Sequence, residues 1–401
     1  MRVGIIGAGA SGMMAAITAS RNGHKVTVLE HGVKPLKKIL ATGNGKCNYT
    51  NSDMNLNHYN DSCRNFVSHI YDRFGHENTV RFFNELGIEA YEKNGYFYPR
   101  SEQAAAIADS LLYDAYRLSI EFITECSVET INKRNGSFLV KTNKGGFEFE
   151  KLIVACGSFA SPKTGSDGSG YDFAKKFGHN IVKPLPALCG LKCEGKFFKR
   201  ISGVRCKAMV SLFVDDEFVK ADVGELQLTD YGISGIPVFQ ISAEAVRAFD
   251  SGKNVSVDID FYPESSDSFE LMDSLKAKIA ICPDKPCKDF LRGTFNTKLC
   301  DLFLDINGID GDIKCGDLTS EDIESLAETI NVFNVKVIGY NADNAQVCSG
   351  GVSLDDVKDT LESKKCEGLY FAGEILDVNG ECGGYNLQWA WSSGYICGLL
   401  E

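Results

Sequence analysis

Several features that would direct the interpretation elsewhere are missing from this sequence. No stretch of its 401 residues stays apolar for the length of a membrane span, so we expect no transmembrane helix. None of the 15 cysteines stands in a C-x-x-C pair and no histidine follows His179, which excludes a thioredoxin-like pair and a mixed zinc knuckle. No long run of lysine or arginine offsets the net charge of −12, so we expect no nucleic-acid-binding surface.

The composition is that of an ordinary globular protein, with 44% hydrophobic and 24% charged residues. Its length allows a large core and two or three structural units. The cysteines are scattered and odd in number, which favours reduced thiols. Because residues 1–6 lead directly into the glycine-rich turn, no signal peptide is expected, and we predict a cytoplasmic protein that acts on a small-molecule substrate.

The first thirty residues carry the strongest positive signal. Val3–Ile6 is an apolar run typical of a buried parallel strand, and a G-x-G-x-x-G turn follows it directly. In such a turn the first glycine permits the tight bend, the second lets the backbone approach a pyrophosphate, and the third lets the next helix pack closely. The N-terminus of that helix offers unpaired N–H groups to phosphates. The turn residues are Gly7, Gly9, Ala10, Ser11 and Gly12.

A second strand, 25–30, ends in Glu30, whose carboxylate can accept hydrogen bonds from ribose hydroxyls. The complete strand–turn–helix–strand context predicts a dinucleotide-binding Rossmann unit. His31 and the loop 34–50 follow, and the loop is too rich in glycine and asparagine for regular structure. By composition it suits either a diphosphate and the polar edge of a flavin or simply a solvated basic loop. Its candidate ligand residues are Lys37, Lys38, Thr42, Gly43, Gly45, Lys46, Cys47 and Asn48.

Near the C-terminus the sequence repeats the pattern of a strand, a glycine turn and a helix start. The strand 368–372 runs into Gly373, and Gly383 and Gly384 open a helix predicted over 385–395. A second glycine-gated helix start is what a bipartite FAD site requires, whereas an NAD dehydrogenase has no need of it. The candidate FAD-binding residues here are Gly373, Glu374, Asp377, Gly383, Gly384, Tyr385, Asn386 and Leu387.

The segment 42–48 reads TGNGKCN and resembles the signature loop of the bile-acid-inducible-N-like flavoproteins, often labelled aminoacetone-oxidase-type FAD-binding enzymes. Three later stretches resemble the same family in the same order, so the resemblance spans essentially the whole chain: 224–235, 345–352 and 369–390. It implies an α/β fold with a glutathione-reductase-like, three-layer Rossmann domain. It further implies that Val128 meets the adenine and that Asp377 meets the ribityl or phosphate-side hydroxyls. It also places a turn against the dinucleotide, formed by Ala155, Cys156 and Gly157.

The character of the sequence changes near Pro184. From 190 to about 262 it is strand-like, from 268 to 304 it is helical, and 331–340 returns to strand. We therefore predict a discontinuous FAD-binding domain, 1–189 and 341–401, interrupted by a β-rich, barrel-like domain, 190–340. The inserted domain is expected to carry a helical subdomain at about 266–330.

These features predict an FAD-dependent oxidoreductase with non-covalent FAD and no metal. A second G-x-G-x-x-G unit is lacking, so NADH or NADPH would bind only transiently. The resemblance implies two precedents, reduction of a steroid-like enone and oxidation of an aminoketone by dioxygen, and we favour NAD(P)H-driven reduction. A flavin–disulfide mechanism is disfavoured because Cys47 has no cysteine four or five residues away. A non-catalytic or RNA-modifying flavoprotein is the alternative from another class, and the acidic charge balance argues against it.

Overall fold

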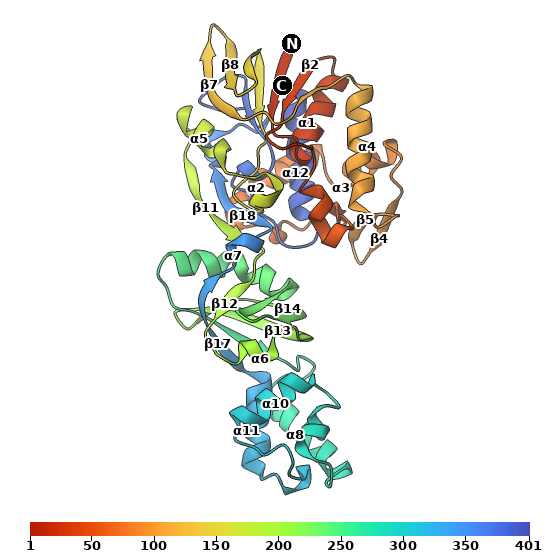
Figure 1. Cartoon of the computed structure of the whole chain (residues 1–401), viewed down its shortest axis with the longest axis vertical. Helices are drawn as coiled ribbons and strands as arrows, with labels where there is room; N and C mark the ends of the chain where they lie inside the picture. Colours follow the sequence, from red (N-terminus) through yellow and green to blue (C-terminus); the bar gives the residue numbers. More distant parts are fainter. The chain divides into compact units, whose positions relative to one another are not determined.

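The computed structural model describes all 401 residues, and the chain divides into two compact units (Figure 1). Unit 1 comprises Met1–Pro186 and Gln346–Glu401, and unit 2 comprises Ala187–Ala345. The chain leaves unit 1 along strand β11 (Ile181–Ala187) and returns along β18 (Val347–Val352), which pair with each other. Unit 1 is therefore built from both ends of the chain.

A five-stranded sheet lies at the centre of unit 1, and all of its strand pairs are parallel. Its strands are short and apolar because both faces are covered, as expected for a parallel sheet. The N-terminal strand β1 is the central one and pairs with β10 on one side and β2 on the other. The strands, in spatial order, are β19 (Leu369–Phe371), β10 (Lys151–Val154), β1 (Arg2–Ile6), β2 (Lys25–Leu29) and β6 (Glu121–Ile123).

Helix α1 (Ala10–Arg21) packs against the last helix of the chain, α12 (Tyr385–Leu399), as the red and blue ribbons show (Figure 1). Two glycines make the contact possible. A Cβ at Gly394 would overlap the carbonyl oxygen of Ser11, and one at Gly398 would lie 2.7 Å from the carbonyl oxygen of Ala15. The two backbones therefore touch where larger side chains would hold them apart, and the first and last helices become neighbours.

The rest of unit 1 consists of four helices and two small antiparallel sheets. The helices are α2 (Arg64–Arg73), α3 (His76–Glu85), α4 (Ala104–Arg117) and α5 (Ser169–Lys176). One sheet has the order β3 (Thr50–Asn51), β5 (Tyr96–Pro99), β4 (Ala90–Lys93), and the other has the order β7 (Val128–Arg134), β8 (Ser137–Thr142), β9 (Gly145–Phe149).

Unit 2 contains a closed six-stranded barrel and a group of helices. The barrel order is β12 (Leu191–Cys193), β15 (Gly232–Gly235), β14 (Glu217–Leu228), β13 (Arg205–Val214), β16 (Val255–Asp260), β17 (Phe333–Tyr340). The helices are α6 (Phe198–Ile201), α7 (Ile236–Asp250), α8 (Ser268–Ile281), α9 (Cys287–Leu291), α10 (Thr297–Ile306) and α11 (Ser320–Asn331). No helix in either unit has the length and apolar character needed to cross a bilayer.

The sequence interpretation was wrong about two local elements. The stretch 190–262, which was expected to be strand-like, contains the fifteen-residue helix α7. Pro237 lies in the first turn of that helix, where its missing N–H costs nothing. The sequence also predicts a β-hairpin over 137–150 that turns on Gly145 and Gly146, but the turn between β8 and β9 lies at Asn143 and Lys144, and Gly145 already begins β9.

The glycine contact between α1 and α12 can be tested by Gly394→Ala. We expect a loss of about 1–3 kcal/mol in the free energy of unfolding, since the added methyl group must push two packed helices apart. Gly146→Ala is the matched control, because a Cβ there meets nothing within 4 Å. Urea unfolding followed by circular dichroism measures both variants. Equal stability of the two variants would contradict the close packing of α1 against α12.

Candidate functional site

The glycine turn after β1 is closed on the protein side and open on the other. Gly7 has a φ of +100°, and a Cβ there would lie 2.6 Å from the carbonyl oxygen of Ala155. A Cβ at Gly12 would overlap the carbonyl oxygen of Gly7. Gly9 differs, because nothing lies within 4 Å of the position its Cβ would take. A pyrophosphate needs this open approach to the second glycine of the turn.

The carboxylate of Glu30 lies at the same turn, at the end of β2. Its Oε2 accepts a hydrogen bond from the Ala8 backbone N–H at 2.7 Å, and its Oε1 accepts one from Gly32 at 2.6 Å. The Glu30 carbonyl oxygen accepts a hydrogen bond from Cys126 N, shortly before Val128 begins β7. His31, next in the chain, is exposed. Glu30 is thus held in place at the carboxyl end of its strand, next to the predicted pyrophosphate turn.

Residues near the C-terminus complete this edge of the sheet. Ser11 Oγ donates a hydrogen bond to the Ala372 carbonyl oxygen at 3.3 Å, and Gly373 N donates one to Ser393 Oγ at 2.9 Å. Glu374 receives a hydrogen bond from Ser158 Oγ at 2.6 Å. The four turns that follow β2, β1, β10 and β19 therefore meet at one edge, because the carboxyl ends of parallel strands lie together.

An ion pair ties the predicted lysine loop to this edge. Lys38 Nζ lies 2.7 Å from Glu374 Oε2, although 336 positions separate the two residues in the sequence. Glu374 Oε1 also accepts a hydrogen bond from the Cys348 backbone N–H at 3.0 Å. Both side chains are only partly exposed, so water screens the pair less than it would at the open surface. The structure thus brings together two charged residues that the sequence analysis had named separately.

The loop 42–48 lies against the start of helix α12. Gly384 has a φ of +92°, and a Cβ there would lie 2.9 Å from Asn48 Oδ1 and 2.8 Å from the Thr50 carbonyl oxygen. Asn48 Oδ1 is buried and has no hydrogen-bond partner. A buried acceptor of this kind calls for a donor, and the polar edge of an isoalloxazine ring carries an N–H. The residues at this position therefore fit a flavin.

Cys47 is a packing residue in this loop. It is fully buried, and burial raises the pKa of its thiol to about 11, although a hydrogen bond with Thr42 acts in the opposite direction. Its backbone N–H donates to the Thr42 carbonyl oxygen at 3.1 Å. A thiol with this pKa stays protonated at neutral pH and is a weak nucleophile.

Several further predicted ligand residues also use their polar groups within the protein. Lys37 Nζ donates a hydrogen bond to the Lys163 carbonyl oxygen at 2.6 Å, and Lys46 Nζ lies 3.0 Å from Glu102. Asn386 receives a hydrogen bond from Gly380 N at 2.9 Å and donates one to Gly380 O at 2.7 Å. The other predicted residues lie at strand ends, at helix starts or in the 42–48 loop: Ala10, Thr42, Gly43, Gly45, Val128, Cys156, Gly157, Asp377, Gly383, Tyr385 and Leu387.

The sequence analysis missed the two tryptophans that brace the site. Trp389 and Trp391 are the only tryptophans of the chain, and both are buried on α12. Trp389 Nε1 donates a hydrogen bond to the Gly373 carbonyl oxygen at 3.1 Å, and Trp391 Nε1 donates one to the Tyr49 carbonyl oxygen at 3.0 Å. Each tryptophan therefore fixes one of the site's loops. Only the presence of two tryptophans in one predicted helix could have indicated these contacts, because a buried tryptophan N–H usually finds a hydrogen-bond partner.

Together, the fingerprint turn, the carboxylate after β2 and the glycine-started helix α12 define the class of Rossmann-type FAD-dependent oxidoreductases. Residues 1–400 match the family described as the HI0933-like protein Rossmann domain, so the chain belongs to that family. Its FAD-binding Rossmann fold and its enzyme class, FAD-dependent oxidoreductase, are thereby confirmed.

Similar proteins are known from several bacteria. A Clostridium scindens protein named 3-dehydro-bile acid delta(4,6)-reductase is 40% identical, with 99% of this chain and 98% of that protein covered. A Haemophilus influenzae protein named ribosomal RNA dihydrouridine synthase is 31% identical, with 98% and 97% covered. Neither is named as an aminoacetone oxidase, so the predicted resemblance holds for the FAD-binding family and not for that label.

Solved structures support the fold alone. The structure of 3-ketosteroid delta1-dehydrogenase from Sterolibacterium denitrificans, in complex with 1,4-androstadiene-3,17-dione, matches with a TM-score of 0.52. The match covers 99% of this chain and 98% of that chain, at 11% identity.

The open approach at Gly9 can be tested by comparing Gly9→Ala with Gly12→Ala. A methyl group at Gly9 meets no protein atom, so we expect unchanged stability and weaker FAD binding, because the methyl group stands in the path of the pyrophosphate. Gly12→Ala should instead lose about 2–3 kcal/mol of unfolding free energy by overpacking. Thermal unfolding of apoprotein and fluorescence titration with FAD separate the two effects. Undiminished FAD affinity in Gly9→Ala would contradict the placement of the pyrophosphate.

The burial of Cys47 predicts a protected thiol. Native protein treated with iodoacetamide at pH about 8 should leave Cys47 unlabelled, because so little thiolate forms at that pH. The same treatment in urea should label it, and peptide mass spectrometry reads out both samples. Rapid labelling in the native protein would contradict the packing role and reopen a role for a reactive thiol.

Proposed function

We propose that this enzyme reduces a carbon–carbon double bond conjugated to a carbonyl group in a polycyclic, steroid-like enone, with NADH or NADPH as the reductant. The observation that carries the proposal is the 40% identity, over nearly the full length of both chains, to the protein named 3-dehydro-bile acid delta(4,6)-reductase. That name describes a substrate with an oxidised C3 position and double bonds to be reduced.

The site residues support flavin chemistry of this kind. The Gly7–Gly12 turn and Glu30 would hold the adenosine and pyrophosphate half of FAD, and Asn48 with the Gly383–Gly384 turn would hold the ring. Bound FAD, once reduced by NADH or NADPH, would supply hydride chemistry to the carbon β to the carbonyl group, and the α carbon would take up a proton. Helix α12 begins at this turn, and its N-terminal partial positive charge favours electron density on the nearby ring edge.

Cys47 supports a reaction without a disulfide relay. Its thiol is protonated and buried, and the sequence places no second cysteine within a few residues of it. Reducing equivalents would therefore pass directly between the nicotinamide, the flavin and the substrate. Because the chain lacks a second dinucleotide fingerprint, the nicotinamide would dock only for the transfer.

A second candidate is reduction of uridine in ribosomal RNA. Two relatives, 31% and 28% identical over nearly their full lengths, are named ribosomal RNA dihydrouridine synthase. The double bond saturated in dihydrouridine is also conjugated to a carbonyl group, so the redox chemistry is the same. We rank this candidate second because identity to the bile acid reductase is higher and because the chain carries a net charge of −12.

The deciding experiment begins with anaerobic holoprotein and follows the visible absorbance of its flavin. We expect NADH or NADPH to bleach the flavin, and a 3-oxo-Δ4,6 bile acid to restore the colour while the substrate gains two hydrogen atoms by mass spectrometry. Gly9→Ala, which should hold FAD weakly, is the control for activity that depends on the bound cofactor.

Two other outcomes would redirect the assignment. Recovery of colour with unmodified ribosomal RNA and not with the enone, together with dihydrouridine in the digested RNA, would favour the second candidate. No bleaching by either nucleotide, with bleaching by aminoacetone and peroxide release in air, would contradict a reductase and identify an oxidase.

A further inference from the structure

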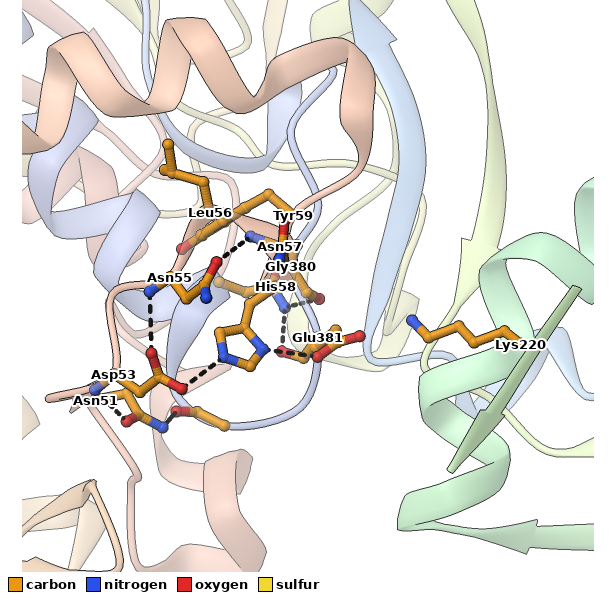
Figure 2. A network of polar contacts seen from close by, with 12 residues as sticks. Asn51, Asp53, Asn55, Leu56, Asn57, His58, Tyr59, Lys220, Gly380 and Glu381 are labelled. Carbon is orange, nitrogen blue, oxygen red and sulfur yellow. Dashed lines mark hydrogen bonds and ion pairs between the residues drawn. The ribbon is translucent and has the colours of Figure 1, made fainter. Parts of the chain in front are cut away.

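A histidine that neither the cofactor fingerprint nor the proposed chemistry uses lies close to the start of helix α12. His58 Nδ1 lies 2.8 Å from Glu381 Oε2, and His58 Nε2 lies 3.0 Å from Asp53 Oδ2 (Figure 2). Carboxylates only accept hydrogen bonds, so both ring nitrogens donate when both contacts are made, and the ring is an imidazolium. It also stacks on Tyr385, with ring centroids 4.3 Å apart and planes inclined by 19°.

The electrostatic environment supports this charged state. Burial disfavours the charge on His58, but the hydrogen bonds to Glu381 and Asp53 outweigh it and raise the pKa of the imidazole. The pKa of the Asp53 carboxyl is correspondingly lowered, chiefly by the hydrogen bond from His58. The Tyr385 phenol, whose pKa burial raises, remains neutral beside the ring. Arg64, another charged residue beside this segment, donates to the Tyr59 carbonyl oxygen and pairs with Asp61.

The chain around His58 binds the turn that precedes α12 at several further points. Glu381 N donates a hydrogen bond to the His58 carbonyl oxygen at 2.9 Å, and Tyr59 forms a β-bridge with Gly380. Asn51 Nδ2 donates a hydrogen bond to the Gly383 carbonyl oxygen at 2.9 Å. Segment 51–59 therefore makes hydrogen-bonded contacts with the 380–384 turn on both sides of Glu381.

Tyr59 extends the grip to the first residue of the helix. Its hydroxyl donates to the Tyr385 carbonyl oxygen at 2.8 Å and also contacts the hydroxyl of Tyr71 on α2. Tyr59 is buried, so loss of either contact would leave a polar group without a partner. Tyr59 thus links segment 51–59 both to helix α2, through Tyr71, and to Tyr385, the first residue of α12. We call the contacts that segment 51–59 makes with residues 380–385 the clamp.

Segment 51–59 is itself ordered by a series of side-chain turns. Asn51 Oδ1 accepts a hydrogen bond from Asp53 N, Asp53 Oδ1 accepts one from Asn55 N, and Asn55 Oδ1 accepts one from Asn57 N. Each side chain bonds the backbone two residues later, a pattern that fixes a loop without regular structure. The Asp53 carboxylate is thereby held facing His58 (Figure 2).

The turn that is gripped needs an external constraint. Gly383 and Gly384 have φ values of +140° and +92°, which glycine reaches easily but does not prefer strongly. Without neighbours, this pair would lose order and the helix N-terminus would lose its fixed direction. The proposed function rests on that direction, because the flavin ring is assigned to this turn.

We propose that His58 is a positioning residue that, with Asp53 and Glu381, fastens segment 51–59 to the 380–385 turn and so pre-forms the flavin end of the site before FAD binds. The expected effect on FAD binding rests on the proposed function, which assigns the flavin ring to this turn. The contacts of the clamp are present without FAD.

The test compares His58→Phe, which keeps the ring stack and removes both N–H donors, with Glu381→Gln, which keeps an acceptor and removes one charge. His69→Phe is the matched control, because His69 lies on the neighbouring helix α2 and its side chain is 64% exposed. The readouts are hydrogen exchange of the 380–386 amides in apoprotein and fluorescence titration with FAD. Both clamp variants should speed exchange and weaken FAD binding about tenfold, as expected when a charge-assisted hydrogen bond is lost.

The pH dependence gives a signature that a merely structural role would not show. Because the folded-state pKa of His58 is raised, its stabilisation is complete below the unfolded value of about 6.5 and is lost as pH rises through the folded value. Wild-type exchange at 380–386 should therefore accelerate as pH rises above about 6.5, after correction for intrinsic exchange, and His58→Phe should lack this step.

Either of two results would overturn the proposal: exchange at 380–386 in His58→Phe that equals that of His69→Phe, or a wild-type pH step that persists in His58→Phe. Glu381→Gln guards against the case in which His58→Phe does not fold. Faster exchange with unchanged FAD affinity would leave the clamp standing and refute the flavin position, so failure of the proposed function is distinguished from failure of the clamp.

Discussion

The packing of helix α1 against helix α12 is the constraint on which the site depends. The contact is made backbone to backbone at Gly394 and Gly398, and it brings Ser11 within hydrogen-bond distance of Ala372. Residues from the two ends of the chain must therefore meet before the cofactor edge exists. Closing so long a loop is entropically costly, which ties the integrity of the site to the stability of unit 1.

A second feature of the site is that its charged groups already have partners within the protein. Both oxygens of Glu30 accept backbone hydrogen bonds, and Glu374 is satisfied by Lys38, Ser158 and Cys348. Groups held this way cost little to order when a ligand arrives, so the frame is preorganised. The Asn48 side chain is uncharged, and its buried Oδ1, which lies where the ring is assigned, has no hydrogen-bond partner within the protein.

The sequence predicted those parts of the structure whose cause is local. The Gly7–Gly12 turn, the strand ending at Glu30 and the helix beginning after Gly384 each follow from adjacent residues, and the family comparison confirms the FAD-binding Rossmann fold. Helix α7 was missed because its apolar, β-branched start resembles a strand, and only the position of Pro237 indicates a helix.

Interactions between distant segments could not be predicted in the same way. The bonds from Trp389 to Gly373 and from Trp391 to Tyr49 join segments that the sequence treats as independent. The environment of His58 is a similar case, because Glu381 lies 323 positions away and no periodic pattern links the two residues. The burial of the two tryptophans and the charged state of His58 result from tertiary packing, and the order of residues along the chain does not reveal that packing.

The lengths of the relatives limit how substrate choice can differ within the family. The protein named for a bile acid and those named for ribosomal RNA each align over at least 96% of their own length with this chain. An added RNA-binding domain therefore does not explain the difference in substrate. The difference in substrate must instead come from side chains carried by the same fold. The redox chemistry of a conjugated double bond is the same in both cases, and only the surface around the substrate changes. For a polyanion that surface has to supply positive charge, and for a polycyclic enone it has to supply apolar area. The net charge of −12 means that this chain has no overall excess of positive charge to offer a polyanion.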